Sequence, residues 1–466
     1  MNPYRVVQTL TSIIIPTLNH WEYTQQCLES VQKYTTSPYE IIVVDNGSTD
    51  ETVPTLKAMS GIILVENGAN KGFPAACNQG IATAHGDQLL ILNNDVIVSY
   101  KWLDNLLDCL YANSQHGAVG PVSNAVSGAQ LRTQSYQTIE EYHEFARTYN
   151  HSDLNKWLYA LRLVGFCLLI HRKVYEQVGT FDERFGKGTF EDDDYSLRIR
   201  RAGYKLVIAA DTYIHHFGSV TNRVDPQYGH LLIENQKKFF EKWKVNPSYS
   251  LWLREDLATL VPKVNRVLDV GCACGGLGLT LKNNGAAYVA GIEFDKNAAI
   301  DAQTVLDQVW VGDAVDIQLP YPDQWFDALV FADVLEHVAQ PQQMLYNLLP
   351  YLKENGYVIT SVPNIGHTEI LSGLLQGTWT YQNAGILDRT HLRFYTLVEI
   401  ARLFEEVGLT IEFVGMVQDS TPEFELLISE LEEVATRLNL PVFDPPFAER
   451  CRTVQYFLRA RKHRID

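Results

Sequence analysis

Paired cysteines are missing from this 466-residue sequence, which excludes a disulfide scaffold. The seven cysteines are dispersed and odd in number, and Cys272 and Cys274 are separated by a single residue. Secreted scaffolds need paired cysteines, and structural zinc sites usually space their cysteines by about two to four residues. We therefore expect a reduced, cytoplasmic chain.

Long apolar runs and positive charge are also scarce. The apolar segment SIIIPTLN (12–19) is interrupted by Pro16, and no stretch approaches the ~20 apolar residues that cross a bilayer. Lys and Arg number 38 against 55 Asp and Glu, a formal net charge of -17. So acidic a chain repels nucleic acid and anionic lipid. We expect no nucleic-acid partner and no transmembrane segment, and any membrane contact would be peripheral, at the inner face of the membrane.

What is present is an α/β pattern that occurs twice without an internal sequence repeat. Short apolar runs at 12–16, 40–45, 61–66 and 88–95 alternate with helical patterns at 21–34 and 73–86. After a helical stretch at 228–244 and a break at NPSY (246–249), the alternation restarts with strand patterns from 266. Such runs predict parallel sheets covered by helices on both faces. We predict two α/β domains, 1–245 and 246–466.

Polar residues follow several strands of the first half. Thr17 ends the first strand, Asp45 the second and Asp95 the fourth. Ligands of open α/β sheets bind beyond the carboxyl ends of the strands, and carboxylate oxygens suit Mg²⁺ or Mn²⁺. Each residue taken alone could equally belong to a turn that bonds its own backbone.

Four consecutive acids, 191–194, precede a helical pattern. Acids at a helix start can bond free backbone N–H groups. A carboxylate held there can also serve as a general base.

Six segments of the first half resemble the family 2 glycosyltransferases: SIIIPTLN, VVDNGSTD, NKGFPAACNQGIATAHGD, LILNNDV, VGTFDERF and FEDDDYSLRIRRAGYKL. The resemblance covers roughly residues 10 to 220. It implies a GT-A fold, a nucleotide-sugar donor, a glycan or lipid-linked oligosaccharide acceptor, Mg²⁺ or Mn²⁺, and inversion at the anomeric carbon.

The resemblance assigns a role to each matching residue. Asp45 would contact the nucleotide base, and Asp95, the last residue of Asn93-Asn94-Asp95, would bind the metal where the family has two acids. His216, or His215 beside it, would complete the metal site. The general base would be Asp192, with Asp194 as the alternative, although Asp194 is also spaced to pair with Arg198. The remaining expected substrate contacts are Thr17, Asn94 and Glu191. The polar stretch 123–157 has little periodicity, and we expect specificity loops there.

A glycine-rich turn opens the second half. VLDVGCACGGLG (267–278) follows a strand pattern, and Glu293 ends the next strand. Glycines let the backbone approach a ligand, and the acid can bind ribose hydroxyls. On spacing alone, NAD, another nucleoside cofactor and a plain turn all remain open.

Further segments resemble class I methyltransferases, with a Rossmann-like fold, from about residue 255 to the end: DVGCACGG, GIEFD, VGDAVD, FDALVFADVLEHV and SVPN. The resemblance implies S-adenosyl-L-methionine, bound by Asp269, Gly271, Gly275, Glu293 and Asp313. Ala273 stands where the middle glycine is usual. TVQYFLRARK (453–462) would be the last strand, which makes about 419–448 a helical insertion.

The segment GTWTYQNAGILDRTHLRFYT (377–396) resembles one found in methyltransferases of surface-glycan pathways. Its aromatic, Arg and His residues suggest a lid that faces the acceptor, and a buried connector is the alternative. His391 and His337 are candidate bases for O-methylation, unless each is a structural histidine.

Together these features predict a bifunctional cytoplasmic enzyme of surface polysaccharide (O-antigen- or capsule-like) biosynthesis. It would transfer a hexose-like sugar and methylate a sugar hydroxyl. A second hypothesis makes the C-terminal domain a non-catalytic module that binds S-adenosyl-L-methionine or glycan. A third makes the whole chain a scaffold with two degenerate sites.

Overall fold

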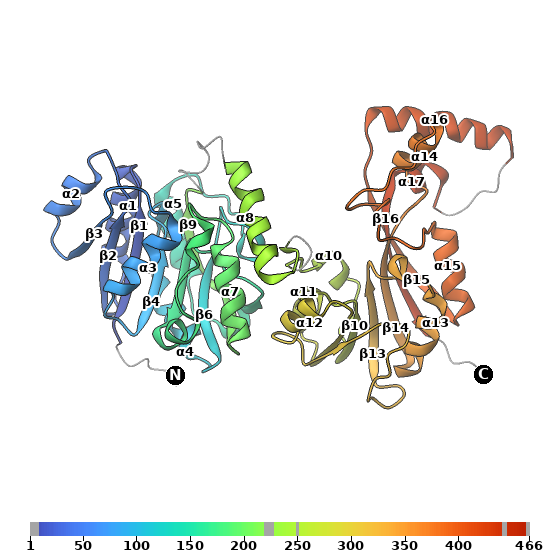
Figure 1. Cartoon of the computed structure of the whole chain (residues 1–466), viewed down its shortest axis with the longest axis horizontal. Helices are drawn as coiled ribbons and strands as arrows, with labels where there is room; N and C mark the ends of the chain where they lie inside the picture. Colours follow the sequence, from blue (N-terminus) through green and yellow to red (C-terminus); the bar gives the residue numbers. More distant parts are fainter. Residues whose placement is uncertain (1–8, 219–227, 248–250, 440–444, 463–466) are drawn as a thin grey trace. The chain divides into compact units, whose positions relative to one another are not determined.

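The computed structural model describes residues 9–218, 228–247, 251–439 and 445–462. The chain divides into two compact units, Met1–Leu251 and Trp252–Asp466. Each has its own sheet and core (Figure 1). The chain therefore has the two-domain α/β architecture expected from the sequence. The predicted break, 246–249, lies partly outside the described residues.

The N-terminal unit is built on a nine-stranded sheet in the order β3-β2-β1-β4-β8-β6-β9-β5, with β7 paired to β9. Its strands are β1 (Thr11–Thr17), β2 (Tyr39–Asp45), β3 (Ile62–Glu66), β4 (Gln88–Leu92), β5 (Val96–Ile97), β6 (His116–Ser123), β7 (Trp157–Ala160), β8 (Cys167–His171) and β9 (Lys205–His216). Its helices are α1 (Trp21–Tyr34), α2 (Thr52–Ala58), α3 (Phe73–Thr83), α4 (Trp102–Tyr111), α5 (Ile139–Tyr149), α6 (Arg172–Val178), α7 (Glu191–Arg201) and α8 (Tyr228–Trp243).

The prediction of an all-parallel sheet is wrong for this unit. Strands β1 to β4 are parallel to one another, but β8 runs antiparallel to both β4 and β6. An apolar run shows that a strand is buried on both faces and does not show its direction. The sheet is therefore mixed.

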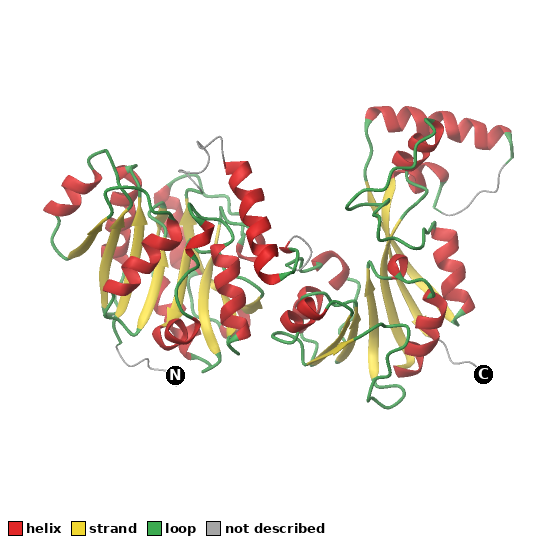
Figure 2. Ribbon diagram, in the orientation of Figure 1, coloured by secondary structure: helices red, strands yellow, loops and turns green. Residues whose placement is uncertain are grey.

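Both faces of the sheet are buried, as the continuous apolar runs require. In β1, Ile13 and Ile15 belong to one core cluster and Ile14 to the other, because successive side chains of a strand point to opposite faces. Figure 2 shows helices along both sides of these strands. Burial on both faces leaves the carboxyl ends of the strands as the place for a ligand.

The C-terminal unit has a seven-stranded sheet in the order β12-β11-β10-β13-β14-β16-β15. The strands are β10 (Arg266–Val270), β11 (Tyr288–Glu293), β12 (Gln308–Val311), β13 (Phe326–Ala332), β14 (Leu352–Pro363), β15 (Leu409–Gln418) and β16 (Thr453–Lys462). The helices are α10 (Glu255–Ala258), α11 (Gly276–Asn283), α12 (Lys296–Ala302), α13 (Pro341–Leu348), α14 (Thr368–Leu375), α15 (Leu397–Glu406), α16 (Pro422–Arg437) and α17 (Phe447–Arg452).

The first five strands of this sheet, from β12 to β14, are parallel, and β16 is antiparallel to both β14 and β15. Between β15 and β16 the chain forms α16 and α17. The predicted insertion, about 419–448, contains α16 but only the first two residues of α17, which ends at Arg452, and residues 440–444 lie outside the described residues. This topology is a Rossmann-like sheet with an antiparallel edge.

Gly80 sets the distance between α3 and the N-terminal sheet. A Cβ at this position would lie 2.3 Å from Ile14 Cγ2 and 3.1 Å from Val44 Cγ2. We predict that Gly80→Ala lowers the free energy of unfolding of the N-terminal unit by about 1–3 kcal/mol through overpacking. Chemical denaturation followed by far-ultraviolet circular dichroism measures the change.

Gly229→Ala, at an exposed position of α8, is the matched control. A Cβ there would meet nothing within 4 Å. An equal loss in both variants would contradict close packing at Gly80.

Candidate active sites of the two units

A cavity of about 740 Å³ opens at the carboxyl ends of β1 and β4, beside the start of α7. It is lined by most of the site residues predicted for the first half, namely Thr17, Asn94, Asp95, Glu191, Asp192 and His216. Asp45 and Asp194 are not among its lining residues. The sequence segments that carry these residues are up to 199 positions apart, and the fold brings them to one place.

Asp95 and His216 face each other in this cavity. The Nε2 atom of His216 lies 3.1 Å from Asp95 Oδ1, and both side chains are buried. The Nδ1 atom of His216 lies 2.7 Å from the carbonyl oxygen of Ala125, which can only accept, so Nδ1 carries a proton. The Nε2 atom therefore presents either a second proton or a lone pair toward the carboxylate. A carboxylate oxygen and an imidazole nitrogen at this distance suit a divalent cation.

Asn94 connects β1 to α1. Its Nδ2 atom donates to Thr17 Oγ1 at 3.2 Å and Thr24 Oγ1 at 2.9 Å. The preceding Asn93 has a buried Oδ1 atom with no hydrogen-bond partner among the described residues. The two asparagines therefore differ. Asn94 supports the wall of the cavity, whereas Asn93 has a buried oxygen that accepts no hydrogen bond from the described residues.

Asp45 is buried in a turn. Its carboxylate accepts from the backbone N–H groups of Gly47 and Ser48, at 3.0 and 3.1 Å. This is the self-bonded turn that the sequence left open as an alternative. The cavity is lined instead by the next residue, Asn46, whose Nδ2 donates to the carbonyl of Gly72.

The four acids of α7 have four different surroundings. Asp192 lines the cavity, and its Oδ2 accepts from the backbone N–H of Gly165 at 3.1 Å. Asp193 forms an ion pair with Arg162 at 2.9 Å. Glu191 is buried, and burial, with the charges of Asp192 and Asp193, raises the pKa of its carboxyl well above the usual range.

Asp194 is fully buried and turned away from the cavity. Its oxygens contact Arg198 Nε at 2.9 Å, Lys242 Nζ at 2.6 Å and Trp243 Nε1 at 2.9 Å. The expected pairing with Arg198 is therefore present. Only Asp192, of the two predicted bases, lies where an acceptor could reach it.

The loop before α7 is held in place by Asn235, which no sequence pattern singled out. Thr189 and Phe190 have positive φ angles of 72° and 65°. The buried Asn235 of α8 donates through Nδ2 to the carbonyl oxygens of Phe185 and Gly188, at 2.8 and 2.7 Å. Residues in this backbone region are retained when their surroundings stabilise them. Asn235 and Arg162 act from distant segments, so no local pattern could have identified them.

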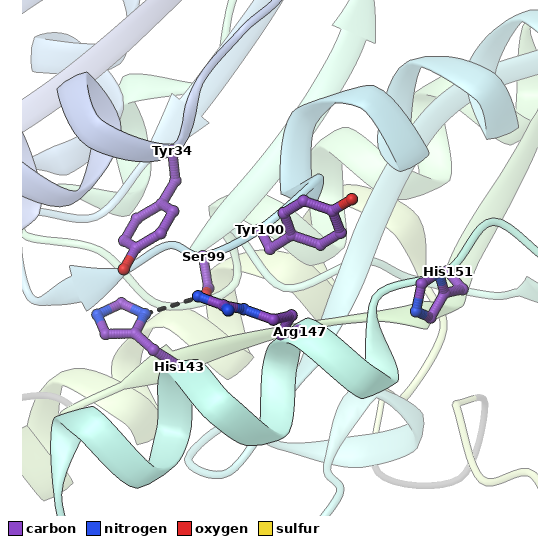
Figure 3. A pocket seen from close by; sticks show the side chains of 6 residues that line it. All are labelled: Tyr34, Ser99, Tyr100, His143, Arg147 and His151. Atoms are coloured by element: carbon purple, nitrogen blue, oxygen red, sulfur yellow. Dashed lines mark hydrogen bonds between the residues drawn. The ribbon is translucent and has the colours of Figure 1, made fainter.

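The stretch 123–157 is largely irregular up to residue 138, and residues 124–127 and Leu131 line the cavity, as expected of specificity loops. It then forms α5, which the sequence did not suggest. The helix buries only Tyr142 and Ala146, which explains the weak periodicity. A second cavity, of about 330 Å³, lies between α1 and α5 (Figure 3). Ser99 Oγ lies 2.9 Å from His143 Nδ1 there, but Ser99 is fully buried. The pair therefore holds α5 in place and does not present a nucleophile.

In the C-terminal unit the glycine-rich turn adopts left-handed backbone conformations. The φ angles are 72° at Gly271, 46° at Ala273 and 85° at Gly275. A Cβ at Gly271 would lie 2.6 Å from Val334 Cγ2, so only glycine fits there. An alanine in this region is strained by about 1–2 kcal/mol. Ala273 therefore keeps the shape of the turn at a cost in stability.

Glu293 ends β11 beside this turn. Its Oε2 accepts from the backbone N–H of Ala273 at 2.7 Å, and its Oε1 from that of Asp295 at 2.8 Å. Each oxygen keeps a further lone pair for a ribose hydroxyl. Behind it, burial and then the charge of Glu293 raise the pKa of Asp269 to about 7. Asp313 is exposed after β12 and accepts from the backbone N–H of Val315.

The segment 377–396 is largely exposed, which excludes a buried connector. Trp379 is 40% exposed and Tyr381 47%. His391 and His337 lie together, with ring centroids 4.8 Å apart. Both therefore belong to one cluster beyond the carboxyl end of β13.

The two units match two different protein families. Residues 12–179 match the model of glycosyl transferase family 2, and residues 245–413 match a methyltransferase domain model. Within the part of the chain that is described, no helix is both long and apolar enough to cross a membrane.

Curated relatives match the N-terminal half. An N-acetylglucosaminyl-diphospho-decaprenol L-rhamnosyltransferase of Mycobacterium tuberculosis is 28% identical over 246 residues, covering 46% of this chain and 78% of the relative. The O-antigen chain rhamnosyltransferase RfbN of Salmonella typhimurium is 26% identical over 229 residues, covering 46% and 69%. A mannosyltransferase from Pyrobaculum calidifontis, solved with GDP-Man and Mn²⁺, is 20% identical with a TM-score of 0.35 and covers 45% of this chain and 57% of that one. The assignment rests on the family models.

The surroundings of Asp194 predict a structural role. Asp194→Asn should lower the free energy of unfolding of the N-terminal unit by about 3 kcal/mol, because it leaves Arg198 without its buried counter-charge and leaves Lys242 paired with Asp182 alone. Chemical denaturation measures the change. The control is Glu241→Gln, which breaks an exposed i,i+4 pair with Lys237 and should cost less than about 1 kcal/mol. Equal effects would contradict the structural role.

Proposed function

We propose that this chain, which joins a family 2 glycosyltransferase domain to a methyltransferase domain, transfers a sugar from a nucleotide-sugar donor to a glycan or lipid-linked acceptor and methylates a sugar hydroxyl. The observation that carries the first activity is the convergence of Asp95, His216 and Asp192 on one cavity. The proposed division between the domains, at 245/246, lies close to the division of the structure into units at 251/252.

Asp192 would act as the general base. A sugar hydroxyl is a poor nucleophile, and a positioned carboxylate that removes its proton accelerates attack by about 10²–10⁴-fold. The Gly165 N–H orients one oxygen of Asp192 and leaves the carboxylate accessible from the cavity. Asp193 and Asp194 are occupied by cationic partners, and the raised pKa of Glu191 favours its protonated form. Asp192 is therefore the acid best suited to accept the proton.

Asp95 and His216 would hold Mg²⁺ or Mn²⁺. The protonated Nδ1 of His216 directs Nε2 toward Asp95, which matches the donor set that such ions accept. A bound divalent cation neutralises the charge that develops on a departing nucleoside diphosphate. Thr17, Asn94 and Glu191 would line the substrate space, and Asp45, held by the N–H groups of its own turn, would contact the nucleotide base.

The relatives suggest the class of glycan. Both relatives described above are rhamnosyltransferases, one acting on N-acetylglucosaminyl-diphospho-decaprenol and the other on the O-antigen chain. We therefore propose a deoxyhexose such as rhamnose as the first donor sugar to test, with a lipid-linked or polysaccharide acceptor in surface polysaccharide biosynthesis. A cytoplasmic chain with peripheral membrane contact would meet such an acceptor.

The C-terminal unit would bind S-adenosyl-L-methionine. The left-handed turn at Gly271 and Gly275 lets the backbone approach the cofactor, and Glu293 presents two oxygens suited to ribose hydroxyls. Asp313, exposed after the next strand, would contact the adenine. The cofactor supplies the methyl group. His391 or His337 would take the proton from the acceptor hydroxyl. Ala273 favours one alternative, in which this unit binds cofactor or glycan without transferring a methyl group.

The transferase assignment predicts a separation of binding from catalysis. Asp192→Asn should lower sugar transfer by at least about 100-fold, because the amide cannot accept the proton. Affinity for UDP, dTDP or GDP with Mn²⁺, measured by calorimetric titration, should stay within about twofold of the parent. Glu176→Gln, an exposed acid on α6, is the control and should leave both unchanged. Normal turnover by Asp192→Asn would refute the assignment.

We predict that replacing Ala273 by glycine raises the affinity of the C-terminal unit for its cofactor. Ala273→Gly should tighten S-adenosyl-L-methionine binding several-fold in calorimetric titration, because it removes a methyl group from the turn that would approach the cofactor. Relief of the left-handed strain of ~1–2 kcal/mol should appear as a gain in folding stability. Ala298→Gly in α12, which has an ordinary helical backbone, is the control and should give no tighter binding. Weaker binding by Ala273→Gly would show that the alanine contributes to the cofactor site.

A further inference from the structure

Three potential metal ligands meet beyond the carboxyl end of β13, the middle strand of the C-terminal sheet. Glu336 and His337 follow β13, and His391 comes from the exposed segment 377–396. One ligand atom from each lies within 4.8 Å of the other two. Neither the sequence patterns nor the family matches assign a metal to this unit.

We propose that Glu336, His337 and His391 bind a divalent transition metal, with Zn²⁺ as the best match. Two imidazoles and one carboxylate form a mixed nitrogen and oxygen donor set, which suits zinc and its neighbours better than Mg²⁺. Three protein ligands leave at least one coordination position for another molecule.

Both imidazoles are oriented as metal-binding histidines usually are. His391 Nδ1 lies 2.9 Å from the carbonyl oxygen of Ile386, which can only accept, so this nitrogen carries the proton. His337 Nδ1 lies 3.2 Å from Thr390 Oγ1, and that hydroxyl donates its own proton to Asp388 Oδ1 at 2.6 Å. His337 Nδ1 is therefore also the protonated nitrogen. Each ring keeps the lone pair of Nε2 for a cation, with a polar second shell that fixes the tautomer. A histidine that binds the ion through this lone pair cannot also take a proton, so metal binding would replace the role of general base proposed above for His391 or His337.

Glu336 provides the independent observation. Its side chain is 1% exposed, and its Oε2 atom has no hydrogen-bond partner among the described residues. Arg254 acts on Glu336 only through its charge, because the ion pairs that this arginine forms among the described residues are with Asp333 at 2.5 Å and Asp256 at 3.1 Å. Burying an acid without a partner is costly, and a bound cation would offset that cost.

The backbone of Glu336 also holds the histidine segment in place. Its carbonyl oxygen accepts from the N–H groups of Leu392 and Arg393, at 2.8 and 3.0 Å. The residues that follow His391 are thus bonded to the residue that supplies the carboxylate. These two hydrogen bonds keep His391 close to Glu336 and His337, so the three ligands are held together by the fold.

The position suggests what the ion would do. Val334, two residues before Glu336, contacts the glycine turn at Gly271. The ion would therefore lie on the acceptor side of the cofactor site, where an open coordination position could take a sugar hydroxyl and orient it. This role rests on the proposed methyl transfer, whereas binding of the ion does not.

Metal binding tests the site directly. The full chain carrying Asp95→Asn and His216→Ala, which removes the cation site proposed in the N-terminal unit, is titrated with Zn²⁺ by calorimetry and with Co²⁺ by visible absorption. We expect one ion per chain. Adding His391→Ala, His337→Ala or Glu336→Gln should weaken binding by at least about 100-fold, since loss of a second-shell partner alone costs about 10–100-fold.

Two further variants keep the result interpretable. Thr390→Val removes the acceptor beside His337 and should weaken binding less than loss of a ligand does. His85→Ala, an exposed histidine of the N-terminal unit, should change nothing. Circular dichroism and S-adenosyl-L-methionine binding report whether each variant is folded.

No ion in the background chain, or equal binding in folded ligand variants, would overturn the site. Metal binding with methyl transfer unaffected by chelation would retain the site and refute its role with the acceptor. Metal binding in a chain that lacks methyl transfer altogether would refute the proposed function and leave the site standing.

Discussion

The burial of several carboxylates at the start of α7 is the constraint on which the N-terminal site depends. A buried charge must be paired or must bind a proton. Asp194 meets this condition with Arg198 and Lys242, and Asp193 meets it with Arg162, whereas burial favours the neutral form of Glu191. These pairings hold the first turn of α7 in place. They leave Asp192 as the acid that faces the cavity with only backbone N–H partners.

In the C-terminal unit the backbone, rather than charge pairing, shapes the site. The glycine turn bonds to β11 through the N–H groups of Gly271 and Cys272, which both donate to the carbonyl of Ile292. Glu293, the next residue, then bonds to Ala273 at the tip of the turn. The acid and the turn thus position each other, and the bond to Glu293 helps to hold Ala273 in its left-handed conformation.

Much of both folds could be predicted from the sequence, because most helices and strands follow from the local alternation of apolar runs with helical patterns. The predicted helix 21–34 and strand 453–462 coincide with α1 and β16. What could not be predicted depends on contacts between distant segments. The direction of β8, the hydrogen bonds of Asn235 to the loop before α7, and the ion pair of Arg162 leave no local periodicity. The same holds for the candidate sites, since motif spacing located Asp192 and His216 but could not show that Asp45 is used within its own turn.

The departure from two acids in Asn93-Asn94-Asp95 has a physical consequence under the proposed function. One carboxylate and one imidazole supply a single negative charge to a divalent ion, so the protein alone leaves the ion only partly neutralised. A nucleoside diphosphate would supply the rest through its phosphate oxygens. Cation and donor would then each raise the affinity for the other by the same factor, because coupling between two ligands is reciprocal. The asparagines would thus make metal retention depend on the donor, and the ion would leave more readily once the nucleotide product is released.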